Sequence, residues 1–238
     1  MVEQVDFGNV RLSYLGHSGF IMRTGKHHIV VDPFLTNAPM ACQKPKDIAA
    51  TDILLTHGHA DHLGDAVEIS KNNHAKITAV WELAQWCANQ GAETIPVPIG
   101  VTQCYDWGKA IFRPAVHSGL LPNGQSFGPA AGIIFDFGGL KIYHLGDTAI
   151  NPDIKFVGEF YRPDVALIPI GGRVNLDICQ AVVVAQWLGV KTVIPTHYDL
   201  FTQGLVDPYD FQREIELKTK IECIVMEPKP SERKVSAL

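Results

Sequence analysis

Short stretches of alternating apolar and polar residues fill the first third of the chain. They predict strands at residues 10–15, 19–23 and 28–31, with turns at Gly16, residues 24–26 and Asp32-Pro33. The continuous apolar run at residues 53–55 indicates a buried strand over residues 52–55. Helical spacing then begins and predicts a helix over residues 60–71. A strand at 77–80 and a helix at 81–89 are expected to follow.

The rest of the chain repeats this progression from strands alone to alternating strands and helices. Strands are expected at residues 109–116, 132–137, 140–145, 164–169, 192–195 and 222–226, and helices at 177–188 and 208–218. Two similar halves, each a mixed sheet covered by helices on one side, predict an α/β fold, a four-layer αββα sandwich. Because the 238 residues contain no linker-like stretch, we expect one domain with halves at 1–108 and 109–227 and a frayed polar tail at 228–238.

Composition excludes several classes of protein. A hydrophobic content of 46% and a charged content of 19% are typical of a soluble enzyme with a sizeable core. The net charge of −5, without a dense Lys/Arg run, argues against a nucleic-acid partner. No apolar stretch reaches the about 18 residues that a membrane span needs. The five cysteines are scattered and never form Cys-x-x-Cys, which favours reduced thiols and a cytoplasmic location.

The densest chemistry lies in residues 56–62, which read Thr-His-Gly-His-Ala-Asp-His. His57, His59, Asp61 and His62 place four metal-binding side chains within six residues, directly after the predicted buried strand. Imidazole and carboxylate together suit zinc and neighbouring divalent metals. A strand that ends in a tight, glycine-containing loop can direct several ligands at one point, so the segment is a candidate metal site.

Three later strand ends carry further candidate ligands. His117, Asp147 and His197 each follow an apolar run and lie close to a glycine or proline that bends the backbone. Any one of them is readily explained as a hydrogen-bonded loop residue. Their joint occurrence with the His-rich loop is much harder to explain that way, and it indicates one shared site.

The order His-x-His-x-Asp-His, then His117, Asp147 and His197, resembles the metallo-β-lactamase superfamily over nearly the whole chain. Residues 16–19, 32–35, 146–148, 169–172 and 195–198 are also similar to one branch, the small bacterial and archaeal metal-dependent hydrolases related to ascorbate-6-phosphate lactonase. The resemblance implies two divalent metal ions, with zinc expected and Mn²⁺ or Fe²⁺ as alternatives. It assigns His57, His59 and His117 to the first ion, Asp61, His62 and His197 to the second, and Asp147 to both.

Such a site implies hydrolysis of a small ester, lactone or phosphoester by a metal-bridging hydroxide. One metal would polarise the substrate oxygen while the other stabilises the leaving oxygen. Asp61 is expected to be catalytic, as a ligand that also orients the hydroxide. His17 is a second catalytic candidate, which lines the pocket and either binds a substrate anion or shuttles a proton. The partner is a small-molecule substrate, and relatives suggest a homo-oligomer.

Residues outside the ligand set receive secondary roles. Asp32 and Asp52 are candidates to accept the second N–H of a ligand histidine. Tyr198 could donate to an oxyanion and Arg173 could bind a substrate anion, whereas the direction of His144 stays open. Residues 120–131 are expected to form a substrate-facing flap. Residues 174–176 read Val-Asn-Leu where the branch often has Phe-Thr-Met, so no substrate is carried over from the branch.

Three other functions remain as alternatives. A nuclease or phosphodiesterase acting on nucleic acid would need an added arm and a basic patch. A diiron redox protein would typically replace one histidine of the first loop by glutamate and add a flavin domain, but His59 is retained. A non-catalytic metal-binding module would have lost ligands, whereas all of the expected ones are present.

Overall fold

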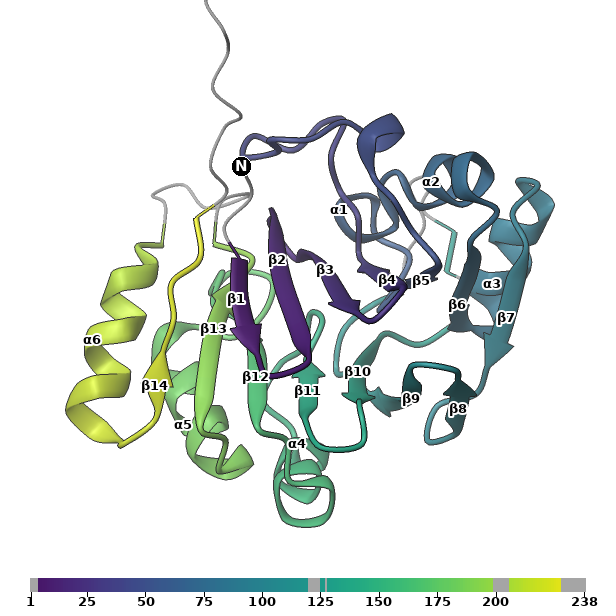
Figure 1. Ribbon diagram of the computed structural model, residues 1–238. Helices are drawn as coiled ribbons and strands as arrows, with labels where there is room; N and C mark the ends of the chain where they lie inside the picture. The colour runs from purple at the N-terminus through teal and green to yellow at the C-terminus, as the bar shows by residue number, and fades with distance from the viewer. Residues whose placement is uncertain (1–3, 120–124, 127, 199–205, 228–238) are drawn as a thin grey trace, which may run out of the picture.

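The computed structural model describes residues 4–119, 125–126, 128–198 and 206–227, and within them the chain forms two seven-stranded sheets (Figure 1). The first sheet contains, in spatial order, β1 (Gln4–Phe7), β2 (Val10–Gly16), β3 (Gly19–Thr24), β4 (His27–Val31), β5 (Asp52–Leu54), β6 (Lys76–Val80) and β7 (Thr94–Val97). Strands β1 to β4 pair antiparallel, and β4 to β7 pair parallel.

The second sheet repeats this topology with the later strands. It contains β8 (Thr102–Tyr105), β9 (Gly108–Pro114), β10 (Ala131–Asp136), β11 (Lys141–His144), β12 (Val165–Pro169), β13 (Thr192–Thr196) and β14 (Glu222–Cys223). Strands β8 to β11 pair antiparallel, and β11 to β14 pair parallel. The chain passes from one sheet to the other between residues 97 and 102. In each half, the strand pairing therefore changes from antiparallel to parallel at the fourth strand, and helices connect the strands that follow.

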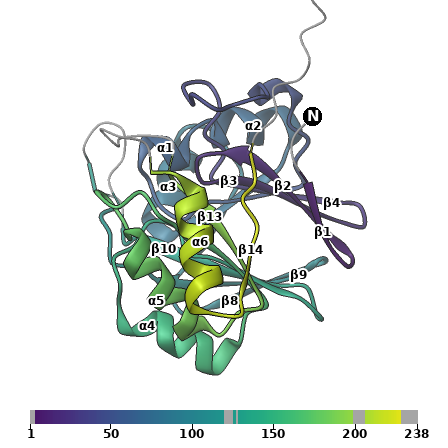
Figure 2. The same cartoon turned by 90° about the vertical axis from the view of Figure 1, so that its left-hand side faces the viewer.

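Helices cover the outer faces of the two sheets. They are the 3-10 helix η1 (Pro45–Asp47), α1 (Ala60–Leu63), α2 (Ala66–Asn73), α3 (Trp81–Asn89), α4 (Pro152–Phe156), the π-helix η2 (Val157–Tyr161), α5 (Ile178–Leu188) and α6 (Pro208–Lys218). Figure 2 shows α5 and α6 on the outer side of the second sheet. The inner faces are fully apolar along strands such as β12, so they form a continuous core. The predicted αββα sandwich is confirmed. Among the described helices, none combines the length and apolar character that crossing a bilayer requires.

Most of the elements match the sequence pattern. Helices α3 and α6 have the predicted bounds, and α5 begins after Asp177, whose side chain forms a capping box with Gln180. The short strands β1, β7 and β8 and the helices α4 and η2 were not predicted, because few of their residues are buried and periodicity is then weak. The predicted tail at 228–238, and residues 120–124 and 127 of the predicted flap, lie outside the described residues.

One helix prediction was wrong. Residues 60–71 form two helices, α1 and α2, which are separated at Gly64 and Asp65. The backbone of Gly64 has a φ of +43°, and a Cβ there would lie 2.4 Å from the carbonyl oxygen of Pro33. The carboxylate of Asp65 accepts hydrogen bonds from the backbone N–H groups of Leu35 and Thr36. The close approach of the chain after β4 therefore ends the helix, although the apolar spacing continues.

The close contact at Gly64 predicts a stability difference between two glycine substitutions. Gly25 also has a positive φ, +52°, but a Cβ there would meet nothing within 4 Å. We expect Gly25→Ala to lower the free energy of unfolding by about 1–2 kcal/mol through backbone strain alone. Gly64→Ala should lose a further about 1–3 kcal/mol from the clash with Pro33. Urea denaturation of both variants measures the difference, and equal losses would contradict the close contact.

Candidate metal centre

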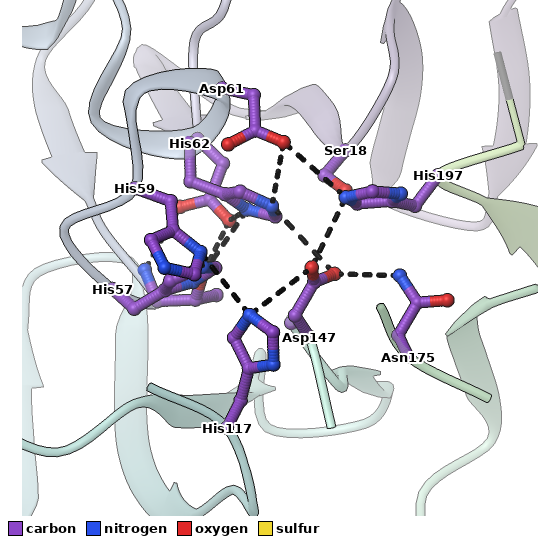
Figure 3. Close-up of polar contacts among 12 residues, drawn as sticks. Ser18, His57, His59, Asp61, His62, His117, Asp147, Asn175 and His197 are labelled. Carbon is purple, nitrogen blue, oxygen red and sulfur yellow. Dashed lines mark hydrogen bonds and ion pairs between the residues drawn. The ribbon is translucent and has the colours of Figure 1, made fainter. Parts of the chain in front are cut away.

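The predicted ligands converge from both sheets. His57 and His59 lie in the loop after β5, Asp61 and His62 on α1, and the remaining three, His117, Asp147 and His197, follow β9, β11 and β13. Figure 3 shows their side chains pointing into one shared space. The donor atoms form two main groups, each within 4.8 Å: the first is His57, His59 and His117, and the second is His17, Asp61, His62 and His197. A third set, His57, His62 and Asp147, overlaps both. The structure thus brings together every predicted ligand and adds His17.

The first group consists of three imidazoles. Nε2 of His57 lies 2.9 Å from Nδ1 of His59, and Nε2 of His117 lies 3.2 Å from that same Nδ1. The opposite ring nitrogens of two of them have hydroxyl partners: Nδ1 of His57 is 3.0 Å from Thr56 Oγ1, and Nε2 of His59 is 3.1 Å from Ser118 Oγ. With a proton on each of those outer nitrogens, the inner nitrogens carry lone pairs that point at one another, an arrangement that a cation stabilises.

The second group surrounds the carboxylate of Asp61. Its Oδ2 lies 3.0 Å from Nε2 of His17, 3.4 Å from Nε2 of His197 and 4.0 Å from Nε2 of His62. The His17 ring also packs against that of His197, with centroids 3.9 Å apart. His17, His62 and His197 are fully buried, whereas Asp61 keeps 13% of its side chain exposed. Asp61 is therefore the acidic group of this cluster that solvent or a substrate can reach.

Asp147 joins the two groups. Its Oδ2 lies 3.6 Å from Nε2 of His117 and 3.1 Å from Nε2 of His197, and its Oδ1 lies 3.7 Å from Nε2 of His62. The side chain is only 2% exposed, so its charge is poorly screened by water. Asn175 donates from Nδ2 to its Oδ1 over 3.1 Å (Figure 3). One carboxylate thus contacts histidines of both groups.

Asp32 orients the loop that carries the ligands. It is completely buried, and its carboxylate accepts hydrogen bonds from the Thr56 backbone N–H at 2.9 Å, the Thr56 hydroxyl at 2.6 Å and Nδ1 of His62 at 2.8 Å. Because the Thr56 hydroxyl donates to Asp32, it is left to accept from Nδ1 of His57. Asp32 therefore sets the tautomer of His62 directly and that of His57 through Thr56, as was predicted for an outer partner of a metal ligand.

The residues present fit a divalent cation. With Nδ1 of His62 bonded to Asp32, its Nε2 is buried and has no hydrogen-bond partner among the described residues. That nitrogen faces oxygens of Asp147 and Asp61 at 3.7 and 4.0 Å, distances too long for hydrogen bonds. Buried polar atoms are rarely left unpaired. A metal ion held between imidazole nitrogens and carboxylate oxygens satisfies all three side chains at once.

The charges differ between the two groups. Burial lowers the pKa of His57, His59 and His117, so these imidazoles are neutral at neutral pH. Burial opposes ionisation of Asp147 too, but His197 and His62 outweigh it and hold the pKa of Asp147 well below its usual range. Burial likewise lowers the pKa of His197, but Asp147 and Asp61 raise it to about 9. The buried carboxylates thus demand positive charge, which protonated imidazoles or a cation can supply.

Backbone strain is concentrated at this site. In the described part of the chain, the residues other than glycine with a positive φ are His17, Asp32, His74, Arg162 and His197. His74 and Arg162 follow helix C-termini, where a left-handed residue is common. The other three belong to the metal centre, at φ values of +55°, +43° and +56°. Strained backbone persists where the surrounding structure enforces it, and it is enriched at functional sites.

Other predicted roles have mixed outcomes. Asp52 lies at the start of β5, whereas the candidate ligands follow the end of that strand, and it accepts a hydrogen bond from Thr51, so its predicted role as the partner of a ligand histidine was wrong. The Tyr198 hydroxyl, which was expected to donate to an oxyanion, donates to the carbonyl of Met226. Arg173, which was expected to bind a substrate anion, is exposed. His144 donates from Nε2 to the Ser18 carbonyl and accepts from the Gly146 N–H at Nδ1, so it fixes the loop that carries Asp147.

Three contacting residues received no role from the sequence. Thr56 and Ser118 are each next to a predicted ligand, and adjacency to His57 and His117 was a usable signal. Asn175 gave no comparable signal, because 28 residues separate it from Asp147. Only the folded chain brings those two side chains together.

Comparison with known proteins agrees with this geometry. Residues 11–197, which include all the predicted ligands, match the model of the Beta-lactamase superfamily domain. The chain is 36% identical over 219 residues to a UPF0173 metal-dependent hydrolase of Natranaerobius thermophilus, a match that covers 92% of this chain and 97% of the relative. A UPF0173 metal-dependent hydrolase of Bacillus cereus is 39% identical over 212 residues, which cover 87% of this chain and 93% of the relative.

A solved structure agrees as well. Igni18, a metallo hydrolase from the hyperthermophilic archaeon Ignicoccus hospitalis, superposes with a TM-score of 0.84 at 33% identity. The superposition covers 92% of this chain and 95% of Igni18. The fold, the convergent histidines and these similarities lead to one conclusion: the chain belongs to the metallo-β-lactamase superfamily and, within it, to the UPF0173 family of metal-dependent hydrolases.

Proposed function

We propose that the protein is a dinuclear metal-dependent hydrolase of a small ester, lactone or phosphoester. The observation that carries the proposal is the position of Asp147, whose carboxylate lies 3.6 Å from His117 on one side and 3.1 Å from His197 on the other. A negative group between two cations reduces their mutual repulsion and helps to keep them at the about 3.5–4 Å separation of two-metal sites. When bound, the two ions would supply Lewis acidity, which lowers the pKa of a water molecule toward neutral pH.

The donor sets divide between two ions. His57, His59 and His117 would hold the first, Asp61, His62 and His197 the second, and Asp147 both. The first set consists of neutral imidazoles, which leave a zinc ion open positions for water. The second set adds oxygen donors, which Mn²⁺ and Fe²⁺ also accept. Zinc is the metal we propose, with those two as alternatives.

Asp61 and His17 are the residues we propose to handle protons. His17 and the neighbouring imidazoles hold the pKa of Asp61 far below its usual range, although burial opposes this, so Asp61 stays ionised. An ionised carboxylate at the exposed edge of the site orients the attacking water by accepting its hydrogen bond. His17 is buried behind Asp61 and contacts its Oδ2 through Nε2 at 3.0 Å. A role for His17 through its contact with Asp61 is therefore favoured over direct binding of a substrate anion.

A turnover screen tests the proposed function. The protein, reconstituted to two zinc ions per chain, is assayed against lactones, phosphodiesters, phosphomonoesters and thioesters. We expect hydrolysis in one of these classes, and the class with the highest kcat/KM names the substrate chemistry. No turnover in any class, at confirmed metal content, would contradict a hydrolytic role.

Replacement of Asp147 should remove metal and activity together. Asp147→Ala takes away the only carboxylate that contacts both groups in the described part of the chain, so the second ion should be lost and turnover should fall beyond the about 10–100-fold typical of outer partners. Metal content by elemental analysis and kcat/KM measure the two effects. Asp136→Ala, on β10 and hydrogen-bonded to the Gly138 N–H, is the matched control. An Asp147→Ala protein that keeps full activity and both metal ions would contradict the proposal.

Asp32 and Asp52 provide a paired test of ligand orientation. Asp32→Asn keeps the size of the side chain but removes the charge that receives Nδ1–H of His62. We expect zinc affinity to fall about 10–100-fold, because the imidazole loses its fixed tautomer. Asp52→Asn should leave zinc affinity unchanged, since its side chain bonds Thr51. Competition with a chromophoric chelator measures both affinities, and equal effects would refute the assignment.

A further inference from the structure

The side-chain amide of Asn175 faces the metal centre with one end and leaves the other end unassigned. Its Nδ2 donates to Oδ1 of Asp147 over 3.1 Å. Its own Oδ1 is buried and has no hydrogen-bond partner among the described residues. The orientation of the amide is set by chemistry, because only the NH₂ group can face a carboxylate without repulsion. The amide oxygen must therefore point away from Asp147.

The atom in need of an acceptor on that side is Nδ1 of His197. Nε2 of His197 faces the carboxylates of Asp147 and Asp61 at 3.1 and 3.4 Å, where the second ion would bind. With Nε2 as the metal-binding nitrogen, the proton of the neutral ring lies on Nδ1. In the described structure, Nδ1 is also buried and unpaired. Ligand histidines almost always donate this second N–H to an oxygen acceptor.

Gly171 shows that the two unpaired atoms border the same space. A Cβ built on Gly171 would lie 3.0 Å from Asn175 Oδ1 and 3.2 Å from His197 Nδ1. It would also lie 2.6 Å from the carbonyl oxygen of His197, too close for a side chain. The absence of a side chain at Gly171 leaves this small polar space open to the amide oxygen and the imidazole N–H.

We propose that Asn175 is a positioning residue that holds Asp147 with its amide nitrogen and offers its amide oxygen as the acceptor for Nδ1–H of His197, the two atoms that the described structure leaves unpaired beside Gly171. His197 belongs to the second group and Asp147 joins the two groups, whereas no hydrogen bond among the described residues links Asn175 to His57 or His59. Its effect should therefore be largest at the second ion, which His197 would bind directly. The inference rests on the proposed dinuclear function and extends it to a residue outside the ligand set.

Asn175→Leu separates this role from packing, because leucine fills the same volume without a donor or an acceptor. Zn²⁺ alone is titrated into chelator-treated wild type and variant. We expect the first ion to bind with unchanged affinity and the second about 10–100-fold more weakly. In the zinc-loaded enzyme, kcat should fall while KM for the best substrate of the turnover screen stays unchanged, because Asn175 does not contact the substrate.

Two further variants keep the test decisive. Asn73→Leu removes a half-buried amide that bonds the carbonyls of Ile48 and Ile69, so it is the control for lost stability, with zinc binding and kcat expected to be unchanged. If Asn175→Leu does not fold, the same zinc titration is done with Asn175→Ala. Wild-type zinc affinity in the Asn175 variants would overturn the inference. Failure of the wild type itself to bind two ions or hydrolyse any substrate would instead overturn the proposed function.

Discussion

The buried carboxylate of Asp32 is the constraint on which the metal centre depends. It lies at the end of β4 and accepts two hydrogen bonds from Thr56 and one from His62, so it ties that strand to the loop carrying four of the predicted ligands. A buried carboxylate is tolerated only when its oxygens are paired in this way. Asp32 also has a φ of +43°, so a strained residue is kept at the point where an imidazole is positioned.

The centre also depends on packing between the two halves of the chain. The first sheet provides His57, His59, Asp61 and His62, while the second provides His117, Asp147 and His197. Hydrogen bonds between the halves lie beside the ligands: the His197 N–H donates to the His17 carbonyl, and His144 donates to that of Ser18. Because neither half holds a complete donor set, metal binding and association of the two sheets reinforce each other, as is general when a site forms only in the folded state.

Short polar side chains beside the ligands set how each ligand is presented. Thr56, Ser118 and Asn175 bond to His57, His59 and Asp147, respectively. Such partners restrict ring orientation and tautomer, and so they determine which nitrogen faces the metal. The superfamily shares its donors across many chemistries, and substrate choice lies in what surrounds them. In this chain, we expect the residues that select the substrate to lie around His117 and at residues 171–176.

The sequence by itself determined the sandwich and, through its resemblance to known hydrolases, the reaction class. It also identified the side chains that converge at the candidate metal centre, because strand ends next to glycine or proline mark where a sheet presents polar groups. Helices such as α3 and α6 were predictable since their periodicity and caps are local. Tertiary structure alone decided the break at Gly64, the contacts of His17 with Asp61, and the approach of Asn175 to Asp147. Those features arise where segments distant in sequence come within hydrogen-bond reach, and no local pattern encodes that distance.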